Sequence, residues 1–352
     1  MNSALPKVLQ PLAGRPLLGH VIDCAHGVGA DDICIVYGHG GDDVRAAFED
    51  SGLRWALQAE QHGTGHAVQQ AMPDTPDDNQ VVVLFGDVPL LKPATVKNLI
   101  DQSGGGDVAV LTVVLDDPFG YGRIVRENGK VVRNVEERDA TDEEKAITEI
   151  NSGVLCCPAR SLKAWLGRLK NDNSQGEYYL TDVLGMAVAD GATVHGVITD
   201  DQVEVMGIND KRQLAEAERA LQQRRVNELL EQGVTFADPA RVDIRGTLQC
   251  GKDVFIDVNV VFEGDVALGD NVRIGMNNLL RDSRIGRGTN VRANCHVEGA
   301  TTGERCVIGP YARLRPEAAL ADEVKIGNFV EIKKSEIADG SKVNHLSSIG
   351  DS

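Results

Sequence analysis

The chain has 352 residues, which at roughly 150 residues per domain suggests two or three domains. Its 36 Lys and Arg residues against 53 Asp and Glu residues give a net charge of −17, and a surface of this sign repels nucleic-acid phosphates and acidic lipid. Binding to nucleic acid or to a membrane is therefore disfavoured. A small phosphorylated substrate stays open, because one metal ion and a few backbone N–H groups can hold phosphate locally.

The first 210 residues alternate between strand-like and helix-like segments. Strands are predicted at residues 33–37, 55–58, 81–85 and 108–115, and helices at residues 43–48 and 66–72. Continuous apolar runs between Gly-rich turns and helices predict a parallel sheet covered on both faces. Ligands of such sheets bind at the carboxyl ends of the strands, where Gly38, Gly63 and Asp87 fall.

The remaining chain has a different period. Residues 210–232 predict one long helix, and from Val242 onward an aliphatic residue recurs every six positions. The inward positions are predicted to be Val242, Leu248, Val254, Val260, Val266 and Val272, then Leu279, Ile285, Val291 and Val297 after a slip of one. A six-residue period favours a parallel β-helix, with each hexapeptide as one flat side, over an ordinary β-sandwich.

The cysteines indicate a reducing compartment. Seven are present, an odd number without a C-x-x-C pair: Cys24, Cys34, Cys156, Cys157, Cys250, Cys295 and Cys306. This usage predicts a cytoplasmic protein with reduced thiols, neither a disulfide framework nor a zinc site.

Several polar residues follow predicted strands, and each has two interpretations. Asp87 after a buried strand suits Mg²⁺ beside a triphosphate, or a turn or helix cap. Lys7 is either a phosphate contact or an ordinary surface lysine. Glu136, Asn151 and Asn209 each end a strand-like run, where they either converge on a sugar or act as caps.

One histidine lies inside the hexapeptide region. His345 is either a general base, with Arg315 and Lys333 binding an anionic substrate, or a solvated corner residue.

Seven segments together resemble one family. They are LPKVL (5–9), QAEQHGTGHA (58–67), FGDVPL (85–90), DPFGYGRI (117–124), EINSG (149–153), GEYYLTD (176–182) and RLRP (313–316). In this order, joined to hexapeptide repeats, they resemble the bacterial bifunctional N-acetylglucosamine-1-phosphate uridyltransferase / glucosamine-1-phosphate N-acetyltransferase family. The resemblance implies an α/β doubly wound Rossmann-like nucleotidyltransferase domain at residues 1–209, a linker helix at 210–232 and a left-handed parallel β-helix at 233–352.

For the first domain the resemblance implies uridylyl transfer from UTP to N-acetylglucosamine-1-phosphate, with release of pyrophosphate. Asp87 and Asn209 would hold Mg²⁺, and Lys7 would contact phosphate. The other implied ligands are Gln58, Gly63 and Thr64 for uracil, Gly122, Glu136 and Asn151 for the sugar, and Phe85 and Gly86 along the pocket. The family commonly has tyrosine at the position of Phe85, so this chain lacks that hydroxyl group.

For the β-helix the resemblance implies acetyl transfer from acetyl-CoA to glucosamine-1-phosphate in a homotrimer. His345 would be the base, with Arg315 and Lys333 on the sugar phosphate and Ser348 where the family usually has tyrosine.

The resemblance also implies a chain truncated at both ends. Only Met1 matches the family's first strand and Gly-rich loop, and the later repeats that carry most of the acetyl-CoA site are missing. We therefore expect low activity from the chain as given. Two alternatives are a single-function nucleotidyltransferase with a regulatory hexapeptide domain, and a non-catalytic binding scaffold.

Overall fold

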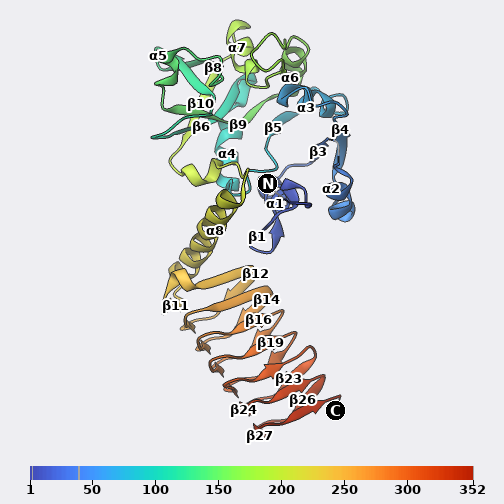
Figure 1. The fold of residues 1–352 in the computed structure, drawn as a ribbon, viewed down its shortest axis with the longest axis vertical. Helices are drawn as coiled ribbons and strands as arrows, with labels where there is room; N and C mark the ends of the chain where they lie inside the picture. The colour runs from blue at the N-terminus through green and yellow to red at the C-terminus, as the bar shows by residue number, and fades with distance from the viewer. Residues whose placement is uncertain (2, 39, 352) are drawn as a thin grey trace. The chain divides into compact units, whose positions relative to one another are not determined.

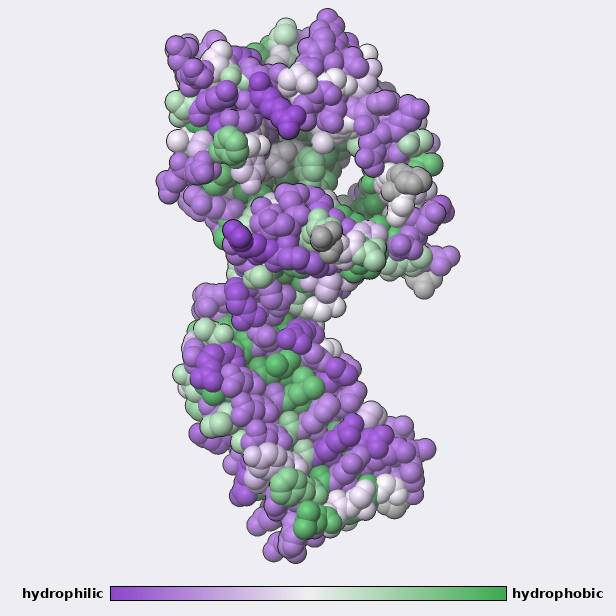
Figure 2. All heavy atoms as spheres, viewed as in Figure 1, coloured by the Kyte–Doolittle hydropathy of each residue, from purple (hydrophilic) through white to green (hydrophobic). Residues whose placement is uncertain are grey.

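The computed structural model describes residues 1, 3–38 and 40–351. The chain forms two compact units, Met1–Gln10 with Pro16–Gln213 and Pro11–Arg15 with Leu214–Ser352 (Figure 1). Hydrophilic side chains cover most of the visible face of each unit (Figure 2), in keeping with the net charge of −17. None of the helices in the described part of the chain is long and apolar enough to cross a bilayer.

The first unit is built on a six-stranded sheet of order β10-β6-β9-β7-β8, with β5 paired to β9. Its strands are β5 (Gln80–Val83), β6 (Val108–Val114), β7 (Arg123–Glu127), β8 (Lys130–Val135), β9 (Glu149–Pro158) and β10 (Val194–Thr199). Two shorter pairs form separate sheets: β3 (Cys34–Tyr37) with β4 (Arg54–Leu57) in this unit, and β1 (Pro11–Leu12) with β2 (Arg15–Pro16), of which residues 11–15 belong to the second unit.

Helices cover both faces of this sheet. The longer ones are α1 (Leu17–Gly27), α3 (Thr64–Ala71), α4 (Pro93–Gln102), α6 (Ala159–Leu166) and α7 (Asp182–Ala189), and the short ones are α2 (Asp42–Ala47) and α5 (Asp142–Lys145). On β6, Val108 and Val110 pack in one apolar cluster with α6 and α7, while Ala109 and Leu111 pack in another with α1 and α4. Because neighbouring side chains of a strand point to opposite faces, this alternation confirms the doubly wound fold.

Three expectations about this unit are wrong in detail. The sheet is mixed, because β9 runs antiparallel to β5, β6 and β7. A strand that is buried on both faces has the same apolar pattern whether it runs parallel or antiparallel to its neighbours. The sequence therefore does not determine the direction of such a strand in the sheet. Asn151 lies inside β9, not at the end of a strand. The run before Asn209 contains a 3-10 helix (Gln202–Val205) and no strand among its described residues.

The second unit is a prism of stacked coils that follows α8 (Lys211–Glu231). A seven-stranded and an eleven-stranded sheet form its sides, and all of their pairings are parallel. The seven strands are β11 (Thr235–Phe236), β13 (Phe255–Ile256), β15 (Arg273–Ile274), β18 (Asn290–Val291), β21 (Val307–Ile308), β24 (Lys325–Asn328) and β27 (Lys342–His345).

The eleven-stranded sheet completes the prism. It contains β12 (Val242–Cys250), β14 (Val260–Leu268), β16 (Leu279–Arg281), β17 (Arg284–Ile285), β19 (His296–Glu298), β20 (Thr301–Thr302), β22 (Arg313–Leu314), β23 (Ala318–Leu320), β25 (Glu331–Lys333), β26 (Ser335–Ile337) and β28 (Ser348–Gly350). The stacked coils are those of the left-handed parallel β-helix that the resemblance implied (Figure 1).

Most of the positions that the six-residue period predicts to point inward are buried. Val260, Val266 and Val272 are completely buried, as expected. Leu248 and Leu279 are only half-buried: Leu248 still packs against the prism core, whereas Leu280 fills the interior in place of Leu279. Each side sends two residues inward, two positions apart, so a slip of one residue exchanges an inward position for an outward one.

One corner of the prism changes character along its length. We call it the corner column, and it comprises Asn259, Asn277, Asn294, Tyr311, Phe329 and Leu346. All six have positive φ, which asparagine tolerates and large side chains rarely adopt. The asparagine amides form a ladder, whereas the Tyr311 and Phe329 rings stack with centroids 5.2 Å apart and stay more than half exposed.

Candidate functional site

Lys7, Asp87 and Asn209 meet at one point although they are far apart in the sequence. Lys7 Nζ lies 2.6 Å from Asp87 Oδ2 and 2.9 Å from Asn209 Oδ1. Asp87 follows the end of β5, Asn209 precedes α8, and the Ile208 amide donates to the Asp87 carbonyl oxygen at 2.9 Å. The structure thus brings together the two side chains that the resemblance assigned to Mg²⁺.

These oxygens fit a hard divalent cation. One carboxylate and one amide oxygen already face a single positive charge, the Lys7 ammonium group, and Mg²⁺ prefers oxygen ligands. Within the described residues no cluster of three or more His, Cys, Asp or Glu side chains could hold a metal. A Mg²⁺ ion held by Asp87 and Asn209 would take further ligands from water and substrate oxygens, as Mg²⁺ at phosphate sites does.

The loop before α3 is tied to the segment before α7. Gln58 Nε2 donates to the Gly63 carbonyl oxygen at 3.1 Å, and the Leu180 amide donates to Thr64 Oγ1 at 3.2 Å. Gly63 has φ +102°, and a Cβ atom there would lie 2.7 Å from the Tyr178 carbonyl oxygen. Glycine avoids this clash, and the hydrogen bonds above connect Gln58, Gly63 and Thr64 within one loop.

Gly122, Glu136 and Asn151 form a second cluster. The Asn151 amide donates to the Gly122 carbonyl oxygen at 2.9 Å. A Cβ atom on Gly122 would lie 2.7 Å from Asn134 Oδ1, and Asn134 Nδ2 donates to Glu136 Oε1 at 2.7 Å. Asn134 Oδ1 is buried and has no hydrogen-bond partner in the described part of the chain. The cluster therefore contains a hydrogen-bond acceptor that the described residues leave unsatisfied.

Phe85 connects the two ends of the site. Its ring packs against Gly153, where a Cβ atom would lie 2.7 Å from Phe85 Cε2. The Gly153 amide donates to Asn151 Oδ1 at 2.7 Å, so Gly153 links the Phe85 ring to Asn151 of the second cluster. Gly86 approaches Val8, the neighbour of the lysine at the cation position.

Two residues without a predicted role belong to this site. Thr181 Oγ1 donates to Glu136 Oε1 at 2.8 Å, and Asn134 contacts Glu136 and Gly122 as described above. Thr181 lies in the GEYYLTD segment, which was noticed only as part of the resemblance. Asn134 stands two residues before Glu136, and the alternation of a strand places both on one face.

The Asp182 carboxyl group, next to Thr181, is electrostatically strained. Burial raises the pKa of Asp182 to about 6, and the nearby carboxylates of Glu136, Asp172 and Asp139 contribute to this shift.

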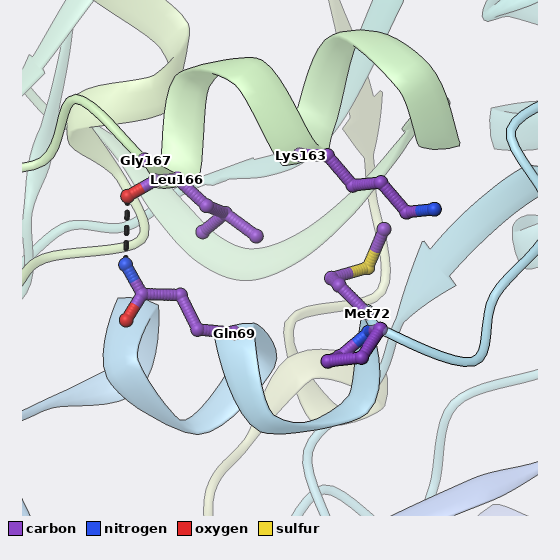
Figure 3. Close-up of a pocket in the computed structure, with 6 residues that line it drawn as sticks. Gln69, Met72, Lys163, Leu166 and Gly167 are labelled. Atoms are coloured by element: carbon purple, nitrogen blue, oxygen red, sulfur yellow. Dashed lines mark hydrogen bonds between the residues drawn. The ribbon is translucent and has the colours of Figure 1, made fainter.

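A hollow of about 320 Å³ lies between α3 and α6 (Figure 3). It is lined by Gln69, Met72, Pro73, Lys163, Leu166 and Gly167. Gln69 Nε2 donates to the Leu166 carbonyl oxygen, and Lys163 Nζ contacts Thr75 and Asp77, so these polar groups are already paired. None of the predicted site residues lines this hollow.

In the prism, Arg315 and Lys333 lie side by side on neighbouring coils. The Arg315 amide donates to the Ile332 carbonyl oxygen at 2.8 Å. Arg315 pairs with Glu331 at 2.9 Å, and Lys333 lies 3.5 Å from Asp351. The two cations therefore share one side of the prism.

His345 and Ser348 lie on different sheets. Ser348 on β28 is paired with Glu331 of β25, whereas His345 on β27 is paired with Asn328 of β24. Among the described residues no hydrogen bond or ion pair joins His345 to Arg315 or Lys333. Within a single prism the expected base therefore makes no hydrogen bond or ion pair with the expected phosphate ligands among the described residues.

A doubly wound sheet with a cation position beside a polar cluster, followed by a parallel β-helix, defines a nucleotidyltransferase joined to a hexapeptide-repeat domain. Comparison with known families agrees: residues 1–235 match the MobA-like NTP transferase domain and residues 244–352 match the GMPPB C-terminal domain.

Curated relatives cover the whole chain. The bifunctional protein GlmU of Herminiimonas arsenicoxydans is 53% identical over 352 residues, which are 100% of this chain and 78% of the relative. Those of Azoarcus sp. (strain BH72) and Paraburkholderia phymatum are 55% and 56% identical, with the same coverage. The chain belongs to the bifunctional GlmU family.

Proposed function

We propose that the first unit transfers the uridylyl group of UTP to N-acetylglucosamine-1-phosphate. A phosphate oxygen of the sugar phosphate attacks the α-phosphorus of UTP, and pyrophosphate leaves. The chain is a bifunctional transferase of UDP-N-acetylglucosamine synthesis, in keeping with its family. The observation that carries the proposal is the meeting of Lys7, Asp87 and Asn209 at one cation position.

In this proposal the three groups of residues divide the substrates between them. Asp87 and Asn209 hold Mg²⁺, which when bound supplies positive charge to the reacting phosphates. Lys7 contacts a phosphate from the same position, because its ammonium group already reaches both ligands. The uracil ligands are Gln58, Gly63 and Thr64, the sugar ligands are Gly122, Glu136 and Asn151, and Phe85 and Gly86 line the pocket between them.

Pyrophosphate release from UTP and N-acetylglucosamine-1-phosphate tests this assignment. Asp87→Asn is expected to lower the rate by about 100-fold or more, the usual loss for a group that stabilises developing charge. Asp77→Asn is the matched control, because Asp77 also pairs with a lysine, Lys163, at 2.7 Å but lies outside the site. Equal rates for the two variants would refute the assignment.

Calorimetry with UTP and Mg²⁺ separates the enzyme from the non-catalytic scaffold. Micromolar binding that is lost in Asn209→Ala supports the cation position and excludes a scaffold without a nucleotide site. Wild-type protein that binds no UTP would favour the scaffold.

We further propose that the prism transfers acetyl from acetyl-CoA to glucosamine-1-phosphate. The amine attacks the thioester carbonyl, His345 takes the amine proton and coenzyme A leaves as the thiol. Arg315, Lys333 and Ser348 bind the sugar phosphate, supported by the adjacent positions of the two cations. Release of coenzyme A that is abolished by His345→Asn tests this step.

A homotrimer through the prism would complete this second site. Two observations support it: His345 lies on a different sheet from Arg315 and Lys333, and the corner column ends in exposed apolar side chains. In a trimer, a neighbouring prism would bring a His345 side chain to the Arg315 and Lys333 side chains of the first. Sedimentation equilibrium measures the assembly directly, and a monomer at micromolar concentration would refute it.

We also propose a cytoplasmic location, supported by the absence of disulfides among the seven cysteines, all of which lie in the described part of the chain. Burial raises the pKa of Cys24 to about 11 and of Cys250 to about 12, which keeps these thiols protonated and unreactive. The proposed division of the chain stays at 1–209, 210–232 and 233–352.

A further inference from the structure

Arg123 is a fully buried cation that the proposed reaction does not use. Its side chain is 2% exposed, the largest among the fully buried side chains. Nη2 lies 2.6 Å from Glu137 Oε2, Nη1 donates to the Tyr121 carbonyl oxygen, and Nε has no partner in the described part of the chain. Burying a guanidinium group costs several kcal/mol unless its contacts compensate. The contacts of Arg123 with Glu137 and Tyr121 therefore have to offset this cost.

These contacts join two segments that carry the proposed sugar ligands. Glu137, the partner of Arg123, also accepts a hydrogen bond from the Gly120 amide at 3.3 Å. The guanidinium group therefore holds the turn before β7 against the residues that follow β8. Gly122 lies inside the first segment, and Glu136 begins the second. Arg123 also pairs with Val135 across β7 and β8. The guanidinium contacts and the register of these two strands therefore both affect the spacing between Gly122 and Glu136.

The two segments enclose a hollow of about 540 Å³. It is lined by Phe119, Gly120, Glu136, Glu137, Arg138, Lys145 and Gln175. Glu136 is thus in the same hollow as the two residues that Arg123 ties together, Gly120 and Glu137. The hydrogen bond from Arg123 holds the pKa of Glu137 below its usual range.

We propose that Arg123 is a positioning residue that sets the spacing between Gly122 and Glu136 and so determines affinity for the sugar end of the substrate. This rests on the proposed uridylyl transfer. A planar guanidinium group makes two directed contacts at once, to Glu137 and to Tyr121, whereas a lysine ammonium group is a point charge without this fork.

Calorimetry on the full chain with UDP-N-acetylglucosamine and, separately, with UTP and Mg²⁺ tests the proposal. Arg123→Lys keeps the charge but loses the fork, and is expected to weaken UDP-N-acetylglucosamine binding about 10-fold while UTP binding stays within twofold. Glu137→Gln keeps an acceptor and is expected to give the same pattern with a smaller loss. Arg126→Lys is the matched control, because Arg126 lies on the same strand and makes a similar fork to Glu149 at 2.6 and 2.7 Å. We expect it to leave both affinities unchanged.

A selective loss for the sugar-bearing ligand supports the proposal, since a merely structural role would weaken both ligands together. Unchanged affinities, or equal losses for the two ligands, in a folded variant overturn it. If Arg123→Lys does not fold, as judged by circular dichroism, the selectivity of Glu137→Gln decides in the same way. Wild-type protein that binds UTP but not UDP-N-acetylglucosamine would overturn the uridylyl proposal itself, which distinguishes the two failures.

Discussion

Alanine at Gly63 is expected to destabilise the first unit and weaken nucleotide binding. The chain offers a control with the same φ, because Gly63 and Gly106 both have φ +102°. A Cβ atom on Gly63 would lie 2.7 Å from the Tyr178 carbonyl oxygen and 3.0 Å from Glu177 Cβ, whereas one on Gly106 would meet nothing within 4 Å. Comparing the two variants therefore separates steric clash from backbone strain.

The magnitude follows from these two contributions to the free energy of unfolding. A residue with a side chain at such a positive φ costs about 1–3 kcal/mol, and this applies to both variants. Overpacking against atoms that cannot easily move costs a further ~1–3 kcal/mol, and this applies only at Gly63. We expect Gly63→Ala to lose about 2–6 kcal/mol and Gly106→Ala about 1–3 kcal/mol.

Tryptophan fluorescence during urea unfolding measures this loss of stability in the first unit of the chain. The chain has 2 tryptophans, Trp55 and Trp165, and both lie in the first unit, so the signal does not report on the prism. Calorimetry with UTP and Mg²⁺ measures the functional part, and only Gly63→Ala is expected to lose affinity, by about 10-fold. Equal losses of stability in the two variants would refute the close approach of residues 63 and 178.

Three further predictions concern charge, metal and assembly. Because burial raises the pKa of Asp182 to about 6, its protonated form stabilises the fold at low pH, and this contribution is lost as the pH rises from about 4 to 6. The stability of Asp182→Asn relative to wild type, measured by urea unfolding, should therefore rise by about 1–2 kcal/mol between pH 4 and pH 7, allowing for partial exposure, and no rise would contradict the assignment. Lys7→Met removes the cation between the two proposed ligands, so Mn²⁺ affinity without nucleotide, measured by electron paramagnetic resonance, should increase about 3- to 10-fold; a decrease would show that Lys7 does not compete with metal. Replacing Tyr311 and Phe329 by asparagine should stabilise the isolated prism by about 0.5–1 kcal/mol, because asparagine tolerates positive φ better. The same replacement should weaken the trimer in sedimentation experiments, because it removes the exposed aromatic rings. Unchanged association would exclude this corner from the interface.

Local sequence signals were sufficient for the prism. Its interior is repeated along one dimension, so a six-residue spacing of aliphatic residues identified one of the two inward positions on most sides of the prism. The error at Leu279 shows the limit of this signal: Leu280 keeps the 18-residue register of Phe262, and the first 17-residue spacing, from Leu268 to Ile285, comes only after it. Where the period slips is decided by the stacking of coils 17 or 18 residues apart, which the spacing of neighbours does not report.

In the first unit the sequence by itself predicted β3, β4, β5 and β6, the helices α2 and α3, and the segments that carry polar residues, because turn glycines and apolar runs are local. Only the tertiary structure decided which of those residues meet. The antiparallel course of β9 places Asn151 beside Gly122, and the segment before α7 brings Thr181 to Glu136. The physical reason is that such contacts depend on strand order and direction, which are set by long-range pairing and not by the residues on either side.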